Sequence, residues 1–310
     1  MCRPNRVRGA CPQWQSYPFL IFALNAPIMW QMQTSSILTR LNGITRWLVP
    51  AAAIAAVAAW MYFAPPGILG KADAVGYAIC HRIDGRSFHV LGRQLPLCAR
   101  CTGEFNAAAI ALVFQAFTAG KRSRLPRRGI IAVLVAFFLA FAIDGSNSYL
   151  YLLKQAGPGM LDQIPNLYVP NNTLRLFTGS GMGIAMAAML FPVVSQTLWR
   201  EADDRPALEW KTLAILAGIG LIADFAILTE SPIVLYPVAI LSVLGVLALL
   251  TMVFTIVWII IMRLENSFMN VGQLWLSVTA GLTLTLLLIL SIDLLRYQLT
   301  GTWSGFPGLG

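Results

Sequence analysis

Long apolar runs alternate with short polar segments along this chain of 310 residues. A helix of about 20 apolar residues crosses the hydrocarbon core of a bilayer, so runs of this length indicate membrane spans. The pattern predicts an all-α fold, a polytopic transmembrane helix bundle of about seven helices. The predicted spans are residues 47–64, 105–119, 130–153, 173–198, 213–230, 237–262 and 274–295.

The start of the chain supports two interpretations. Arginines precede the apolar run Tyr17–Trp30, which is typical of a signal or interfacial segment because about 14 residues are too few to cross a bilayer. Alternatively, translation begins at Met32, and we favour this start because Arg40 and Arg46 then lead directly into the first convincing span. The predicted divisions are an N-terminal extension (1–46), one membrane domain (47–300) and a tail (301–310).

Composition agrees with the membrane assignment. Hydrophobic residues make up 57% of the chain and charged residues 11%, compared with about 25% charged residues in soluble domains. The net charge of +9 would fit a nucleic-acid partner, but the basic residues lie mostly in short loops beside apolar runs, where the positive-inside rule accounts for them. We therefore expect membrane lipid as a partner and no nucleic acid.

The basic loop at residues 121–128 predicts the orientation. It holds the densest group of Lys and Arg in the chain, and such loops stay in the cytoplasm. This places the N-terminus in the cytoplasm and the segment 67–104 on the extracytoplasmic side. That segment carries five basic residues, counting Lys71, and we expect a binding site to use its arginines.

Segment 67–104 also concentrates metal-ligating residue types. Three of the five Cys and both His lie between Cys80 and Cys101. The Cys98-x-x-Cys101 spacing lets two sulfurs reach one ion, and Zn²⁺ accepts mixed sulfur and nitrogen ligands in tetrahedral geometry. We therefore predict a zinc site formed by Cys80, His81, Cys98 and Cys101, with His89 as the alternative to His81.

Other chemistry remains open at this segment. Cys98 and Cys101 are also spaced for thiol oxidoreductase chemistry, in which they would exchange disulfides or pass electrons to a quinone. A disulfide in a purely structural loop is a third reading. With only three protein ligands, zinc would keep a position for water and Glu104 could act as a base, so a zinc-assisted enzyme acting on a lipid-linked anion is a further alternative.

Charged residues in the spans suggest a polar vestibule on the same side as segment 67–104. Ionisable groups inside a membrane are costly and usually face partners or water. We predict an ion pair between Asp144 and Arg175, and a vestibule that also contains Asp224; Glu104, Asp144 and Asp224 are the catalytic candidates. A phosphate or carboxylate, lipid-linked or small, is the expected ligand of the arginines Arg82, Arg86, Arg93, Arg100 and Arg175. Glu230, Asp293 and Arg296 fit interfacial positions at helix ends better than a site.

Several of these motifs occur together in one known family. They are Cys80-His81 with Arg86-Ser87-Phe88, Gly92-Arg93-Gln94-Leu95-Pro96, Cys98-Ala99-Arg100-Cys101-Thr102-Gly103, Asp144-Gly145, and Asn172-Thr173-Leu174-Arg175 with Thr178-Gly179. Through these motifs, residues 75–195 resemble the bacterial and archaeal membrane proteins grouped as domain-of-unknown-function 2085. The resemblance implies an integral membrane protein and places Cys80, His81, Arg86, Cys98, Cys101, Asp144 and Arg175 in the family pattern. It implies no activity.

The sequence thus predicts a multi-pass protein of the cell membrane with a zinc site at its extracytoplasmic face. A metal-stabilised binding or scaffold role is the preferred function, and a membrane enzyme is the alternative.

Overall fold

The computed structural model describes residues 28–156, 159 and 163–303, and the side chains from residue 43 onward. The described residues form an all-α helical bundle with two small two-stranded sheets, so the predicted fold class is confirmed. The signal-like run before residue 28 and most of the predicted tail lie outside the described residues. The helices are α1 (Ile28–Phe63), α2 (Ile68–Ile79), α3 (Ala99–Thr118), α4 (Arg128–Ala156), α5 (Asn172–Leu198), α6 (Trp210–Leu228), α7 (Pro232–Ile261) and α8 (Trp275–Thr300).

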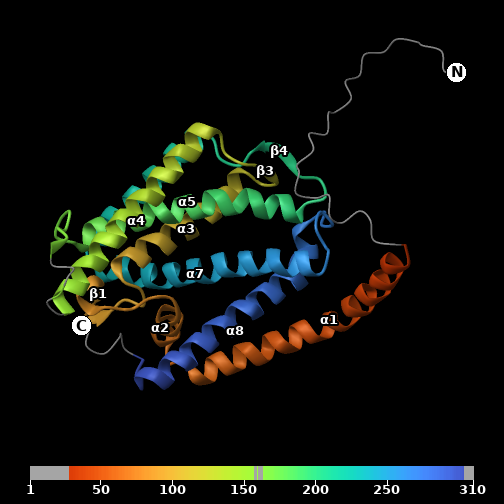
Figure 1. The fold of residues 1–310 in the computed structure, drawn as a ribbon, viewed down its shortest axis with the longest axis horizontal. Helices are drawn as coiled ribbons and strands as arrows, with labels where there is room; N and C mark the ends of the chain where they lie inside the picture. The colour runs from red at the N-terminus through yellow and green to blue at the C-terminus, as the bar shows by residue number, and fades with distance from the viewer. Residues whose placement is uncertain (1–27, 157–158, 160–162, 304–310) are drawn as a thin grey trace, which may run out of the picture. The chain divides into compact units, whose positions relative to one another are not determined.

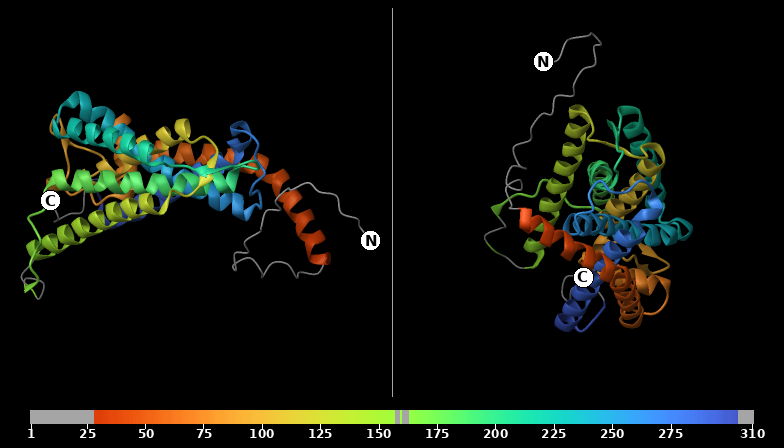
Figure 2. Two further views of the ribbon diagram at one scale, coloured as in Figure 1. Left: turned by 90° about the horizontal axis from the view of Figure 1, so that it is seen from above. Right: turned by 90° about the vertical axis from the view of Figure 1, so that its right-hand side faces the viewer.

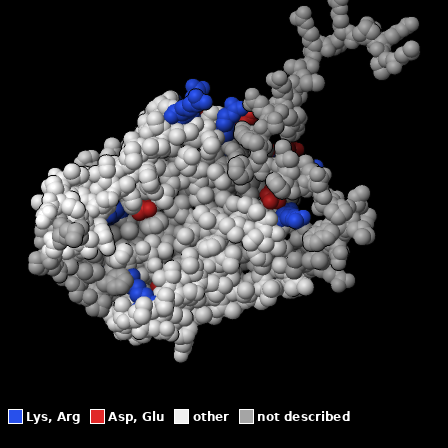
Figure 3. All heavy atoms as spheres, in the orientation of Figure 1, with Lys and Arg blue, Asp and Glu red and all other residues white. Residues whose placement is uncertain are grey.

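Six helices of the described chain are long and apolar enough to cross a membrane: α1 from Gly43, α4, α5, α6, α7, and α8 with the 3₁₀ turn before it (Val271–Leu274). Large apolar side chains on these helices are exposed, Ile222 and Ile233 among them, as expected for surfaces that face lipid. On the face shown in Figure 3, charged side chains are few and lie in separate groups. The chain is therefore a multi-pass membrane protein.

The second predicted span corresponds to α3, which is not among these six helices. Its first turns carry Thr102, Gly103, Glu104 and Asn106, which lower its hydropathy. The helix is nonetheless 20 residues long, so it extends for about 30 Å. It tolerates polar residues because neighbouring helices, rather than lipid, surround much of it.

The described residues from 46 to 303 form one compact unit, and α3 lies in its interior. This helix packs most extensively against α5 and then against α7, while α4 and α6 pack on α5, and α8 packs on α7. Figure 1 shows α3, α5 and α7 running alongside one another, and the right view of Figure 2 shows α4 and α6 on either side of α5. Short α2 packs against α7 and α8.

Close contact between α3 and α5 depends on small residues. A Cβ added to Gly179 of α5 would lie 2.1 Å from the carbonyl oxygen of Arg100 in α3, a distance that no side chain can occupy. Small residues allow this approach of backbones in membrane helix pairs, where van der Waals contact drives association. The contact fixes the first turn of α3 against α5.

The loops at the two ends of α3 have different structures. At the end where α3 begins, residues 80–98 contain a 3₁₀ turn, η2 (Asp84–Arg86), and an antiparallel hairpin of β1 (His89–Val90) and β2 (Arg93–Gln94). At the other end, β3 (Arg122–Arg124) pairs in parallel with β4 (Asp203–Pro206). The β3–β4 pair joins the loops that follow α3 and α5, and the first of these, at 121–128, is the most basic part of the chain.

Candidate metal centre and adjoining cavity

Three cysteines from two segments meet where α2 ends and α3 begins. Cys80 follows the last residue of α2 in an extended conformation, and Cys98 is the N-cap of α3, which places Cys101 in the first turn of that helix. Their sulfur atoms all lie within 4.8 Å of one another. Zinc–sulfur bonds of about 2.3 Å place tetrahedral thiolates about 3.8 Å apart, so small side-chain adjustments would suffice to bring all three onto one ion.

Backbone and thiol groups around Cys80 favour its ionised form. Its sulfur accepts hydrogen bonds from the backbone N–H groups of Arg82 and Cys98, each at 3.4 Å. Hydrogen bonds with the Cys101 and Cys98 side chains lower the pKa of Cys80 well below its usual value, although burial acts in the opposite direction. For Cys98, the Cys101 contact lowers the pKa, but the Cys80 side chain and burial outweigh it and raise the pKa to about 11. The cluster thus favours one thiolate, and a bound cation would be needed to stabilise ionisation of the other two thiols.

Among the described residues, neither histidine belongs to the cluster formed by the three cysteine sulfurs. His81 directly follows Cys80 and lines the same cavity as the three cysteines. His89 lies in β1, where its Nε2 is 2.9 Å from Oδ1 of Asp84 in an exposed pair. Proximity therefore favours His81 over His89 as a fourth protein ligand.

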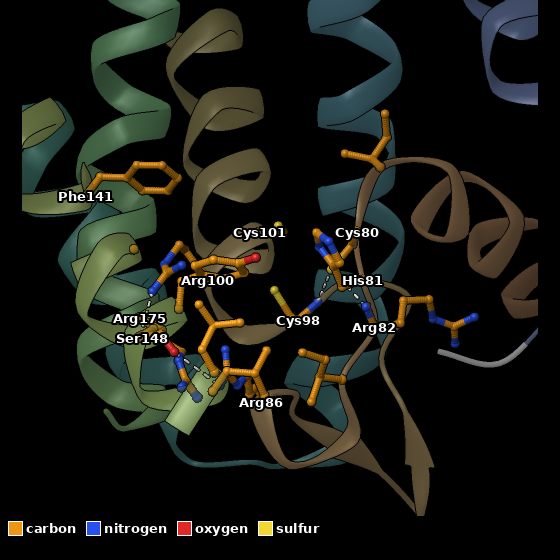
Figure 4. Close-up of a pocket in the computed structure, with 16 residues that line it drawn as sticks. Cys80, His81, Arg82, Arg86, Cys98, Arg100, Cys101, Phe141, Ser148 and Arg175 are labelled. Atoms are coloured by element: carbon orange, nitrogen blue, oxygen red, sulfur yellow. Dashed lines mark hydrogen bonds between the residues drawn. The ribbon is translucent and has the colours of Figure 1, made fainter. Parts of the chain in front are cut away.

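A cavity of about 550 Å³ adjoins the cysteines. Four arginines line it: Arg82 and Arg86 from the loop, Arg100 from α3 and Arg175 from α5. Figure 4 shows the cysteines between Arg82 on one side and Arg100 and Arg175 on the other. The remaining wall comes largely from α4, through Phe141, Leu152 and Leu153 as well as Ser148.

Asp144 forms its ion pair with Arg100, and not with Arg175 as the sequence predicted. Nε of Arg100 donates to Oδ2 of Asp144 at 3.0 Å, and its Nη2 donates to the same oxygen and to Oγ of Ser148. The hydroxyl of Tyr168 donates to the other carboxylate oxygen at 2.8 Å. The prediction failed because the long side chain of Arg100 reaches Asp144 from the first turn of α3, whereas the Arg175 guanidinium hydrogen-bonds to Asn172 within its own helix.

The remaining arginines have different surroundings. Nη1 of Arg175 donates to Oδ1 of Asn172 at 2.9 Å, and Nη2 of Arg86 donates to the carbonyl oxygen of Ser148 at 3.2 Å. Burial and the positive charge of Arg100 lower the pKa of Arg86. Arg82 and Arg93 share one carboxylate, Asp73, and Arg93 does not line the cavity.

The carboxylates proposed as catalytic candidates do not line the cavity. Asp224 of α6 accepts a hydrogen bond from Oγ of Ser180 at 2.6 Å. Glu104 lies one turn along α3 from Arg100, in the stretch that packs against α5. Asp144 pairs with Arg100, which lines the cavity, but does not line it itself. The geometry therefore supports binding through cations and thiols more directly than acid–base catalysis by a carboxylate.

Arg296 is a site residue that sequence reasoning missed. It is buried, as is Asp293, so neither has the interfacial position expected for it. Its Nη1 donates to the carbonyl oxygens of Tyr77 and Cys80, and its Nη2 to that of His81 at 3.3 Å. The guanidinium also lies over the Tyr77 ring, 4.0 Å from its centroid. A cation at the C-terminus of a helix satisfies its last carbonyls, and here it holds the end of α2 that presents Cys80.

The fold and this site define a multi-pass membrane protein in which a cluster of three cysteines could hold a metal ion. A family model described as "Predicted membrane protein (DUF2085)" matches residues 80–189, which confirms the resemblance over a range that includes all three cysteines, Asp144 and Arg175. An uncharacterised protein of Methanocaldococcus jannaschii is 22% identical over 129 residues, which are 41% of this chain and 71% of the relative. No solved structure matches the chain. Neither description states an activity.

Proposed function

We propose that Cys80, Cys98 and Cys101 bind one Zn²⁺ ion, which stabilises the loop over the cavity in a binding or scaffold role. The observation that carries this proposal is the convergence of three sulfurs within 4.8 Å from segments 18 residues apart. Zinc suits a site rich in thiolates and needs no redox partner. His81 or a water molecule would complete the coordination, with His89 as the less favoured alternative.

The metal would act as a structural bridge. Cys80 belongs to the end of α2, whereas Cys98 and Cys101 belong to the start of α3. One ion bound to all three would close the intervening loop, which also carries Arg82 and Arg86 of the cavity wall. Because a bound metal adds its binding free energy to that of folding, zinc would hold these arginines in place.

Elemental analysis of the purified full-length chain tests the proposal. We expect about one zinc per chain, lost in Cys98→Ser and retained in Ser87→Ala, which alters a buried polar side chain of the same loop. His81→Ala would weaken zinc retention against a chelator, whereas His89→Ala would not. A chain that folds but holds no zinc when purified under reducing conditions with added metal would overturn the zinc assignment.

A thiol oxidoreductase is the second candidate, because the lowered pKa of Cys80 beside two further thiols also suits thiol exchange. It would link two of the three sulfurs on oxidation and release them on reduction. Metal-free protein whose thiols titrate reversibly in a glutathione redox series, with loss of the transition in Cys101→Ser, would support this candidate over zinc.

We also propose that the cysteine loop faces the extracytoplasmic side, because the opposite end of the bundle carries the basic loop at 121–128. Leu91 lies in the hairpin and is 88% exposed, and Glu201 is exposed near the other end. A membrane-impermeant thiol reagent applied to intact cells would label Leu91→Cys above the unsubstituted chain but not Glu201→Cys. The reverse result would invert the orientation.

A further inference from the structure

The cavity beside the cysteines has walls of one charge sign. Among the residues that the structure describes, its lining includes Arg82, Arg86, Arg100 and Arg175 and no acidic side chain. Arg175 is buried, with 6% of its surface exposed. Four guanidinium groups around one partly enclosed space repel one another unless carboxylates or a ligand compensate them.

Protein carboxylates compensate only part of this charge. Asp144 pairs with Arg100, and Asp73 pairs with Arg82 while also contacting Arg93 outside the cavity. Within the described ranges, two carboxylates thus face four lining arginines, which leaves an excess of two positive charges. A zinc ion held by three thiolates would carry one net negative charge, so the walls stay positive with or without the metal.

Arg86 and Arg175 keep donors for a ligand. Each guanidinium has five N–H donors, and within the described part of the chain each of these two side chains makes one hydrogen bond, to the Ser148 carbonyl and to Asn172 respectively. They come from the loop and from α5, so their approach from two directions suits an anion held between them. Planar guanidinium groups match phosphate and carboxylate oxygens in pairs.

Much of the remaining lining is apolar. Phe141, Leu152 and Leu153 of α4 line the same cavity as the arginines, together with Ile79 and Ile83 from α2 and the loop. A small inorganic anion would leave this surface without a partner. A cavity of about 550 Å³ lies in the range of about 300–1,000 Å³ that holds small-molecule ligands.

We propose that this cavity binds an amphiphilic anion, a phosphate monoester carrying an apolar chain, with Arg86 and Arg175 on the phosphate and the α4 side chains on the apolar part. The site takes its positive charge from the arginines, and this charge stays positive with or without zinc. The same phosphate chemistry is found in membrane lipids and in free inorganic phosphate, and only the lipid form uses the apolar wall.

Titration calorimetry on the full-length protein in uncharged detergent tests this assignment. The probes are dioctanoyl phosphatidic acid, the matched neutral dioctanoylglycerol, and inorganic phosphate. We expect the phosphatidic acid to bind and the two other probes to bind at least about tenfold more weakly, because each lacks one of the two contacts. Arg86→Gln and Arg175→Gln should each weaken phosphatidic acid binding by about tenfold or more.

Controls separate binding from folding and from the zinc site. Arg93→Gln removes a neighbouring arginine that does not line the cavity and should leave the affinity unchanged, while Arg86→Lys keeps the charge and should restore part of it. Zinc content and elution volume are measured on the same samples. Cys98→Ser that loses zinc but still binds phosphatidic acid would show that the anion site is separate from the zinc site. Equal binding of inorganic phosphate, or equal loss in Arg93→Gln and Arg86→Gln, would overturn the proposal.

Discussion

An arginine–aspartate pair lies near each end of α3, and the two pairs differ in their surroundings. At the cysteine end, Arg100 and Asp144 are 19% and 2% exposed, and Tyr168 and Ser148 add hydrogen bonds. At the basic end, Arg124 and Asp204 are 58% and 78% exposed. Water can replace either partner of the exposed pair but has little access to the buried one. The buried pair is therefore expected to constrain the fold, and the exposed pair to serve mainly topology and solubility.

Removal of the buried carboxylate should have the largest effect. Asp144→Asn keeps the shape of the side chain but leaves the Arg100 guanidinium in a confined site without its counter-charge, which costs about 3–5 kcal/mol. Unfolding in mixed micelles with increasing denaturing detergent would measure this loss in the free energy of unfolding. A change below about 1 kcal/mol would show that the two ends are equivalent.

A bulkier residue at the contact between α3 and α5 should have the next largest effect. Gly179→Val directs new methyl groups at the Arg100 carbonyl, and we expect a loss of about 3 kcal/mol because the neighbouring atom is backbone and cannot rotate away. Gly218→Val in α6 is the matched control, since no heavy atom lies within 4 Å of a Cβ there. Equal effects in the same unfolding assay would contradict the close packing at the cysteine end.

Loss of the anchor on α2 should act on the metal more than on the bundle. Arg296→Met retains much of the apolar stem but removes the hydrogen bonds to Tyr77, Cys80 and His81, at a cost of about 2 kcal/mol. We expect zinc affinity to fall by about tenfold, as it does when groups that orient metal ligands are removed. Competition with a coloured chelator gives this affinity. Unchanged affinity would mean that the cysteines hold their positions without the arginine.

Removal of the exposed carboxylate should have the smallest effect. Asp204→Asn breaks the pair with Arg124, and the expected change is below about 1 kcal/mol because solvent screens the charges. The same unfolding assay used for Asp144→Asn measures it. A loss comparable to that of Asp144→Asn would remove the distinction between the two ends.

Sequence patterns predicted the membrane helices well because hydropathy depends on local composition alone. They missed α2, since its 12 residues lie in a segment assigned to the loop and are too few to span a bilayer. The α3 helix was predicted as a span only from residue 105 onward, whereas it begins at Ala99. Helix starts that carry polar and small residues are recognisable once their neighbours are known, and these neighbours are distant in sequence.

At the candidate site, too, the sequence predicted features that depend on local spacing and missed those that depend on distant neighbours. The Cys98-x-x-Cys101 spacing predicted that two thiols share one turn, which needs no tertiary information. The partner of Asp144 depends on which arginine side chain reaches it in the folded bundle, and the role of Arg296 depends on where α8 ends relative to α2. An arginine among the apolar residues of α8 was the available signal, because such a residue requires a partner inside the protein.

The anchoring of the cysteine loop by Arg296 has a consequence for biosynthesis. Cys80 precedes that arginine by 216 positions, and the chain leaves the ribosome at about 5–20 residues per second with its N-terminal parts first. The loop therefore waits on the order of tens of seconds before its anchor has been made. We expect the anchored geometry at the cysteines only after α8 has been made, so the proposed metal loading would be a late step of assembly.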